Sequence, residues 1–99
     1  MNHVWVRTVD GDLLRASLIR QINTEGGLRA ILTAGSQFML AETSVRQTAD
    51  EIALRLVAAI AAAEAHVDAC VLGVVTDEHD NWAVTATVLP AVAAIAPVG

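Results

Sequence analysis

The stretch that decides the fold is TADEIALRLVAAIAAAEAH, residues 48 to 66. Its apolar side chains recur at helical spacing, and Ile52, Leu56 and Ile60 form a stripe that should face a core. Thr48 followed three residues later by Glu51 predicts a capping box, in which each side chain accepts a hydrogen bond from a backbone N–H of the first turn. The sequence therefore predicts one long helix over residues 48–66.

A second apolar stripe runs along the opposite side of this helix. It consists of Leu54, Ala58, Ala61 and Ala65. A helix that is apolar nearly all round is typically covered on two sides. In this chain the second cover would be either the tail at residues 90–99 or another subunit. We therefore predict that this stripe is the interface of a homodimer or higher oligomer. The alternative is that alanine, a good helix former, simply tolerates exposure.

The chain before the helix predicts strands, beginning with a hairpin. Residues 3–9 alternate, and a three-residue loop, Val9-Asp10-Gly11, would let Gly11 adopt a left-handed conformation. This loop pairs Trp5 with Arg15 and separates the hairpin into two faces. One face carries Val4, Val6, Leu14 and Ala16, and the other carries Trp5, Arg7, Leu13 and Arg15.

Two further strands are expected between this hairpin and residue 43. The second strand continues irregularly to Ile22, because Leu18-Ile19 breaks the alternation and indicates a bulge or short turn. Residues 23–27 form the next loop, and strands over 28–34 and 37–42 are joined by a two-residue turn with Gly35 first. The first 42 residues thus predict a four-stranded antiparallel meander.

After the helix, residues 69–76 are an uninterrupted apolar run that predicts a strand buried on both faces. Residues 77–81 are polar and form a loop, and residues 82–89 alternate as the second strand of a hairpin. The order β-β-β-β-α-β-β predicts an α+β domain with the helix packed on an antiparallel sheet. Residues 1–89 form this single domain, and residues 90–99 form an apolar C-terminal tail.

In element order, the first 60 residues resemble small bacterial proteins of the FlbD type, in which a short meander leads into a helix. The resemblance lies in the segments Arg15-Ala16-Ser17-Leu18-Ile19 and Phe38-Met39-Leu40-Ala41-Glu42. It is a resemblance of layout, and no function is inferred from it.

Charge and composition argue against several classes of partner. The 99 residues carry a net charge of −5, with six arginines and no lysine, a bias that GC-rich bacterial coding produces. Residues 1–46 carry +1 and residues 47–99 carry −6, so nucleic acid and anionic membrane are unlikely partners. Neither a secretory signal nor a membrane span is visible, which predicts a soluble cytoplasmic protein.

The residues able to carry chemistry do not form a recognisable catalytic set. Cys70 excludes an internal disulfide because it is the only cysteine, and it should pack as a small hydrophobe. The loop Asp77-Glu78-His79-Asp80-Asn81 offers metal-binding atoms, but polar residues also suit any solvated hairpin. His3, His66 and His79 lie on three different segments. We therefore predict no catalytic residues, no metal and no cofactor, and we do not favour an enzyme.

The best candidate site is the outer face of the first hairpin, formed by Trp5, Arg7, Leu13 and Arg15. Tryptophan and arginine are the residue types most enriched at binding hot spots, although a solvated sheet face is the simpler interpretation. The sequence favours a self-associating, non-catalytic interaction or accessory protein that binds a protein partner through this face. The alternatives are a small-molecule binder or small enzyme with a pocket between helix and sheet or at a subunit boundary, and a nucleic-acid-binding regulator using Arg7, Arg15, Arg20 and Arg29.

Overall fold

A computed structural model describes residues 3–43, 45–79 and 81–89, which form two β-sheets and one α-helix. The predicted α+β class is confirmed, while the tail at residues 90–99 lies outside the described residues. In chain order the elements are β1 (Val4–Arg7), β2 (Leu13–Arg15), the 3-10 turn η1 (Ala16–Leu18), β3 (Ile19–Asn23), β4 (Leu28–Leu32), β5 (Gln37–Ala41), α1 (Arg46–Glu64), β6 (Ala69–Thr76) and β7 (Trp82–Leu89).

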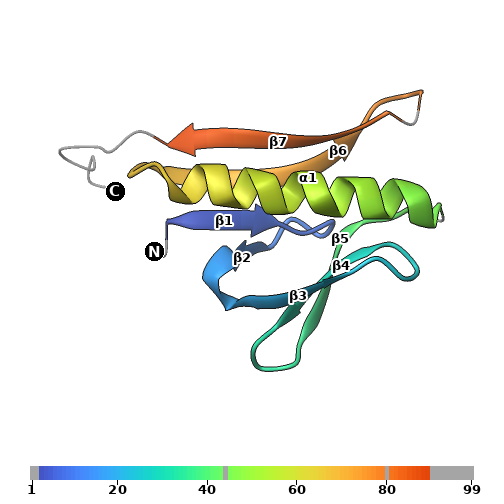
Figure 1. The fold of residues 1–99 in the computed structure, drawn as a ribbon, viewed down its shortest axis with the longest axis horizontal. Helices are drawn as coiled ribbons and strands as arrows, with labels where there is room; N and C mark the ends of the chain where they lie inside the picture. The colour runs from blue at the N-terminus through green and yellow to red at the C-terminus, as the bar shows by residue number, and fades with distance from the viewer. Residues whose placement is uncertain (1–2, 44, 80, 90–99) are drawn as a thin grey trace, which may run out of the picture.

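The strands divide into a four-stranded and a three-stranded sheet. The first has the order β2-β1-β6-β7 and is mixed, because β1 and β6 run parallel while the two hairpins are antiparallel. The second, β3-β4-β5, is antiparallel and lies beyond the first hairpin (Figure 1). The first hairpin is thus joined to the last hairpin of the chain.

The predicted four-stranded meander is therefore wrong. Its second strand is divided by η1, so that β2 ends at Arg15 and the chain enters a different sheet at Ile19. The broken alternation at Leu18-Ile19 is the sequence signal of this turn. Of the two alternatives that it indicated, the short turn is present, and this turn ends the strand. The N–H and the hydroxyl of Thr33 both donate to the carbonyl of Leu18, which ties this turn to the end of β4.

The helix is confirmed, but its predicted N-terminal cap is wrong. The helix spans Arg46–Glu64, so it begins and ends two residues earlier than predicted, with Val45 at the N-cap position and no side-chain capping bond. Thr48 lies inside the first turn, so its hydroxyl is not placed to cap it. Instead, the hydroxyl of Thr43 accepts the N–H of Val45 at 3.2 Å, a local turn of the kind that threonine favours before a helix.

Two of the predicted turns have the same geometry. The first hairpin has the predicted three-residue loop and register: Gly11 adopts a φ of 90°, and Trp5 pairs with Arg15. The turn between β4 and β5 repeats this loop over residues 33–35, with Gly35 last at a φ of 95°. The predicted two-residue turn with Gly35 first is therefore wrong. Because the loop begins at residue 33, β4 ends at Leu32 and not at residue 34.

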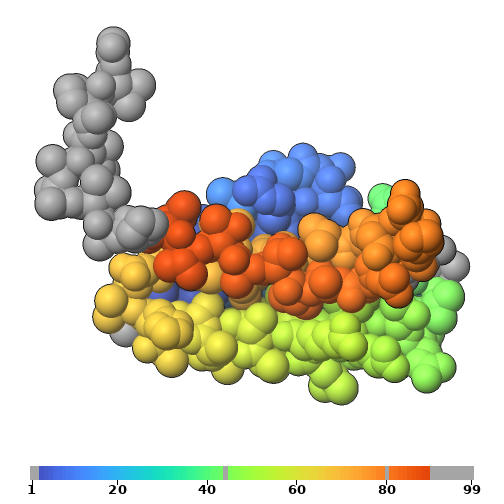
Figure 2. Space-filling view, turned by 90° about the horizontal axis from the view of Figure 1, so that it is seen from above, coloured from blue at the N-terminus to red at the C-terminus, as the bar shows by residue number. Residues whose placement is uncertain are grey.

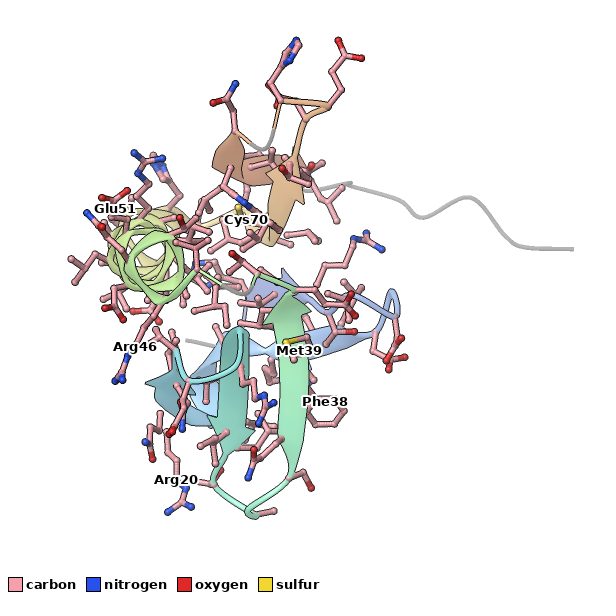
Figure 3. All side chains as sticks on the ribbon, turned by 90° about the vertical axis from the view of Figure 1, so that its right-hand side faces the viewer. Arg20, Phe38, Met39, Arg46, Glu51 and Cys70 are labelled. Atoms are coloured by element: carbon pink, nitrogen blue, oxygen red, sulfur yellow. The ribbon has the colours of Figure 1, made fainter. Side chains whose placement is uncertain are left out.

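The core lies between α1 and one face of the four-stranded sheet, closed at one end by the three-stranded sheet. Its fully buried members include Val4, Val6, Leu28, Leu40, Ile52, Leu56 and Leu72. Figure 3 shows Cys70 between the helix and β6, and this thiol is buried and free, as its expected packing role requires. The prediction that β6 is buried on both faces is wrong, because the helix covers only the face that carries Cys70 and Leu72.

Within the described residues, no helix is both long and apolar enough to cross a membrane.

Candidate interaction surface

The four-stranded sheet has an open face on the side away from α1. The register of the strands places Trp5 beside Val71, and Val71, Gly73 and Val75 alternate with the buried residues of β6. This face collects the four predicted partner-binding residues and residues from the far end of the chain: Trp5, Arg7, Leu13, Arg15, Val71, Gly73, Val75, Ala83, Thr85, Thr87 and Leu89. We call this set the open face.

At one end of the open face, Trp5 and Arg15 form the contact that the hairpin register predicts. The guanidinium carbon of Arg15 lies 5.1 Å from the centre of the Trp5 ring, within the range of a cation–π interaction. The two residues are opposite each other across β1 and β2, and Trp5 is half-buried while Arg15 is exposed. The pair therefore places an aromatic ring and a cation together on the open face.

Replacing Arg15 with alanine should lower the free energy of unfolding by about 0.5–1 kcal/mol through loss of this contact. Arg7→Ala, at an exposed position of the same face, is the matched control, for which a change within about 0.5 kcal/mol is expected. Urea unfolding of Arg15→Ala, Trp5→Leu and the double variant measures the coupling. A coupling energy near zero would show that the two side chains lie together without stabilising each other.

A groove of about 800 Å³ lies along the open face and continues toward the end of the three-stranded sheet. Its sides are formed by Arg7 and Leu13 of the first hairpin and by Thr85 and Thr87 of β7, and Val71, Gly73 and Val75 form its floor. Glu42, which follows β5, adds an acid at the groove, so the mainly apolar surface carries one charge of each sign, from Arg7 and Glu42.

A second groove, of about 620 Å³, separates α1 from β3. Its lining includes Ile19, Ile22, Leu54, Val57 and Ile60. Leu54 is 74% exposed, and Ala58, Ala61 and Ala65 are exposed as well, so the predicted oligomer stripe faces away from the core. Of this stripe, Leu54 is the member that lines the groove, and no residue among those described covers the stripe.

The three histidines do not converge on one site. The Nε2 atom of His3 lies 3.1 Å from the carbonyl oxygen of Ala63, and His66 donates its N–H to the same oxygen, so both are at the C-terminal end of α1. His79 lies in the loop between β6 and β7, at the other end of the molecule (Figure 1). A site that uses all three is not formed in this chain.

The loop at residues 77–81 is organised around Asp77. One carboxylate oxygen of Asp77 accepts the N–H groups of His79 and Asn81, and the other accepts the side-chain amide of Asn81. Hydrogen bonds from the backbone and side chain of Asn81, and then from His79, lower the pKa of Asp77 below its ordinary value of 3.8. The loop thus uses this carboxylate to fix its own conformation, while Asp80 lies outside the described residues.

Comparison with known proteins gives no family for this chain. No protein-family model, curated protein or solved structure matches it. In the described ranges, no three residues among histidine, cysteine, aspartate and glutamate are grouped in a way that could hold a metal ion.

Sequence reasoning found the hairpin side of the open face but not its other half. The sequence predicts a separate hairpin for Val71, Gly73, Thr85 and Thr87, because no local pattern pairs β1 with β6. Residues 4–6 and 70–72 are both apolar throughout, as suits two neighbouring strands under one helix, but this likeness alone does not identify β1 and β6 as neighbours.

Proposed function

We propose that this chain is a small interaction or accessory protein that binds a segment of a partner protein along the open face. The observation that carries the proposal is the groove of about 800 Å³ on a sheet face that α1 leaves uncovered. Apolar floor residues with a few polar groups at the rim are typical of sites that bind an extended peptide or small ligand.

The chemistry of the groove favours a peptide with a mainly apolar character. Val71 and Val75 offer apolar contact, the threonines of β7 offer hydroxyl groups, and Trp5 with Arg15 supplies an anchor beside the groove. Arg7 and Glu42 would each pair with an opposite charge on the partner, which would fix its direction.

A peptide library displayed on phage and selected on the immobilised chain should yield sequences that bind with a dissociation constant of about 1–100 μM, as expected for a short segment on a small groove. Leu13→Glu places a charge at the groove and should weaken binding at least about tenfold, equivalent to about 1.4 kcal/mol. Val67→Glu, at a position that is 87% exposed and does not line the groove, is the matched control. Selected peptides that bind Leu13→Glu as well as wild type would contradict the proposal.

The second candidate function is binding of a small molecule between α1 and β3. The groove of about 620 Å³ at this position favours it, because the apolar residues Ile22, Leu54 and Ile60 surround a space of ligand size. Native mass spectrometry of the purified chain would show a bound compound, and Leu54→Glu should then release it.

Self-association is the other part of the proposal. Two exposed surfaces are candidates for it: the helix stripe of Leu54, Ala58, Ala61 and Ala65, and the free edge of the four-stranded sheet at β7.

A further inference from the structure

We propose that two copies of the chain pair through β7, antiparallel around a two-fold axis at Ala86, so that two four-stranded sheets join into one eight-stranded sheet. This inference deepens the self-association part of the proposed function and assigns it to the sheet edge in place of the helix stripe. It rests on a comparison of the sheet edges, on the direction of the backbone groups of β7, and on the surroundings of that strand.

Among the four sheet edges, β7 differs from the other three. β2 is three residues long, β3 carries Arg20 next to an irregularity in its pairing, and the carbonyl of Met39 in β5 already accepts the N–H of Val9. Short length, charge, bulges and covering are the devices by which proteins protect sheet edges from pairing. By contrast, β7 has eight residues in continuous register with β6, and none of them is charged or a proline.

The register also shows which backbone groups of β7 face outward. The N–H of Cys70 donates to the carbonyl of His3, so the backbone groups of Cys70 point toward β1 and those of Val71 and Gly73 point toward β7. Their partners Thr87 and Thr85 therefore point inward. Val84, Ala86 and Val88 present their N–H and C=O groups to the outer side of the sheet.

The outward-facing groups are arranged symmetrically about Ala86. On one side the carbonyl of Trp82 accepts a hydrogen bond from Arg55 at 3.4 Å, and on the other residue 90 is a proline, which has no N–H. The stretch between them is centred on Ala86. An identical strand running the opposite way places Val84 against Val88 of the partner subunit and Ala86 against its own copy, which satisfies both edges at once.

The surroundings of β7 suit a second copy of this chain. The net charge of −5 would oppose association, but β7 contributes none of that charge. Figure 2 shows β7 along the surface beside α1. The helix flank on this side begins at Arg55 and continues through Ala58, Ala59 and Ala62 at helical spacing, so small side chains leave the approach open. Val88, on the helix side of β7, is 54% exposed and would be covered.

Light scattering coupled to size-exclusion chromatography of the full chain should give twice the chain mass of 10.4 kDa. Ala86→Pro removes one outward N–H without removing a bond to β6, and should reduce the mass to that of the monomer. Ala86→Thr keeps the N–H and should remain dimeric. A wild type that stays monomeric up to about 1 mM would overturn the proposal, because such an affinity is too weak to be specific. A folded, dimeric Ala86→Pro would overturn it as well.

A charge exchange keeps the proposal testable if the proline variant does not fold. Ala86→Lys and Ala86→Glu each place like charges together at the two-fold axis, so each should be monomeric alone. An equimolar mixture of the two should regain the dimer mass, because each axis then carries opposite charges. Two variants that remain monomeric when mixed would overturn the placement of the axis at Ala86.

Two further variants separate this proposal from its neighbours. Leu54→Glu should leave the dimer intact, and if it dissociates the dimer while Ala86→Pro does not, the helix stripe is the interface and the β7 assignment is wrong. The monomeric Ala86→Lys should still bind peptides selected on the open face, since residue 86 is on the opposite side of the sheet. If the wild type is monomeric but still binds these peptides, the proposed binding function stands and only the pairing through β7 is overturned.

Discussion

Replacing Leu56 with alanine should lower the free energy of unfolding by about 2–5 kcal/mol, a large part of the stability of a domain of this size. Leu56 is fully buried between α1 and the sheets, where it belongs to the same cluster as Val6 and Leu72. The loss combines the transfer free energy of the removed methine and two methyl groups with the cost of the cavity that they leave.

The same helix offers a matched control two residues away. Leu54→Ala removes the same atoms from a position that is 74% exposed, so the free energy of unfolding should change by no more than about 0.5 kcal/mol. Urea unfolding followed by circular dichroism measures both variants. Equal losses for Leu54→Ala and Leu56→Ala would contradict the orientation of α1.

Local patterns in the sequence were sufficient to predict elements whose interactions are local. The helical spacing of Ile52, Leu56 and Ile60, the glycine at position 11 and the alternation over residues 82–89 each specify a structure through contacts within a few residues. The first hairpin illustrates this best. Its loop fixes the register, and the register fixes the face on which Trp5 meets Arg15.

The division into two sheets could not be predicted in this way, because it depends on contacts between distant segments. The parallel pairing of β1 with β6 brings Val4 beside Cys70, and no local pattern in either segment names the other as its neighbour. The short turn η1, which directs β3 away from β2, is marked in the sequence by one broken alternation that fits a bulge equally well.

The candidate site shows the same limit. Its Trp5–Arg15 half follows from the hairpin, whereas the groove requires β6 and β7 to lie beside β1. The prediction that β6 is buried on both faces hides this site, because a sheet covered on both sides has no open face. An uninterrupted apolar run is expected for a fully buried strand. It is equally compatible with a strand such as β6, which has the core on one side and the apolar open face on the other.

Replacing Gly27 with alanine should cost about 3 kcal/mol of unfolding free energy, more than the same substitution at Gly11. Gly27 adopts a φ of 122°, and a Cβ added there would lie 2.9 Å from the carbonyl oxygen of Ala41 and 3.0 Å from the sulfur of Met39. Met39, labelled in Figure 3, can change its rotamer, but the carbonyl of Ala41 belongs to the backbone of β5, where Ala41 pairs with Leu28. The backbone must therefore shift.

Gly11→Ala separates the steric cost from the conformational one. Gly11 also has a positive φ, of 90°, but a Cβ there meets nothing within 4 Å, so its substitution should cost only about 1–2 kcal/mol of backbone strain. Urea unfolding of both variants gives the difference, and equal costs would contradict the close approach of Gly27 to Ala41. Because Ala41 and Glu42 line the groove, Gly27→Ala should also shift their amide resonances and weaken the binding of peptides selected on the open face. Gly11→Ala, at an exposed turn outside the groove lining, should leave that binding within about twofold of wild type.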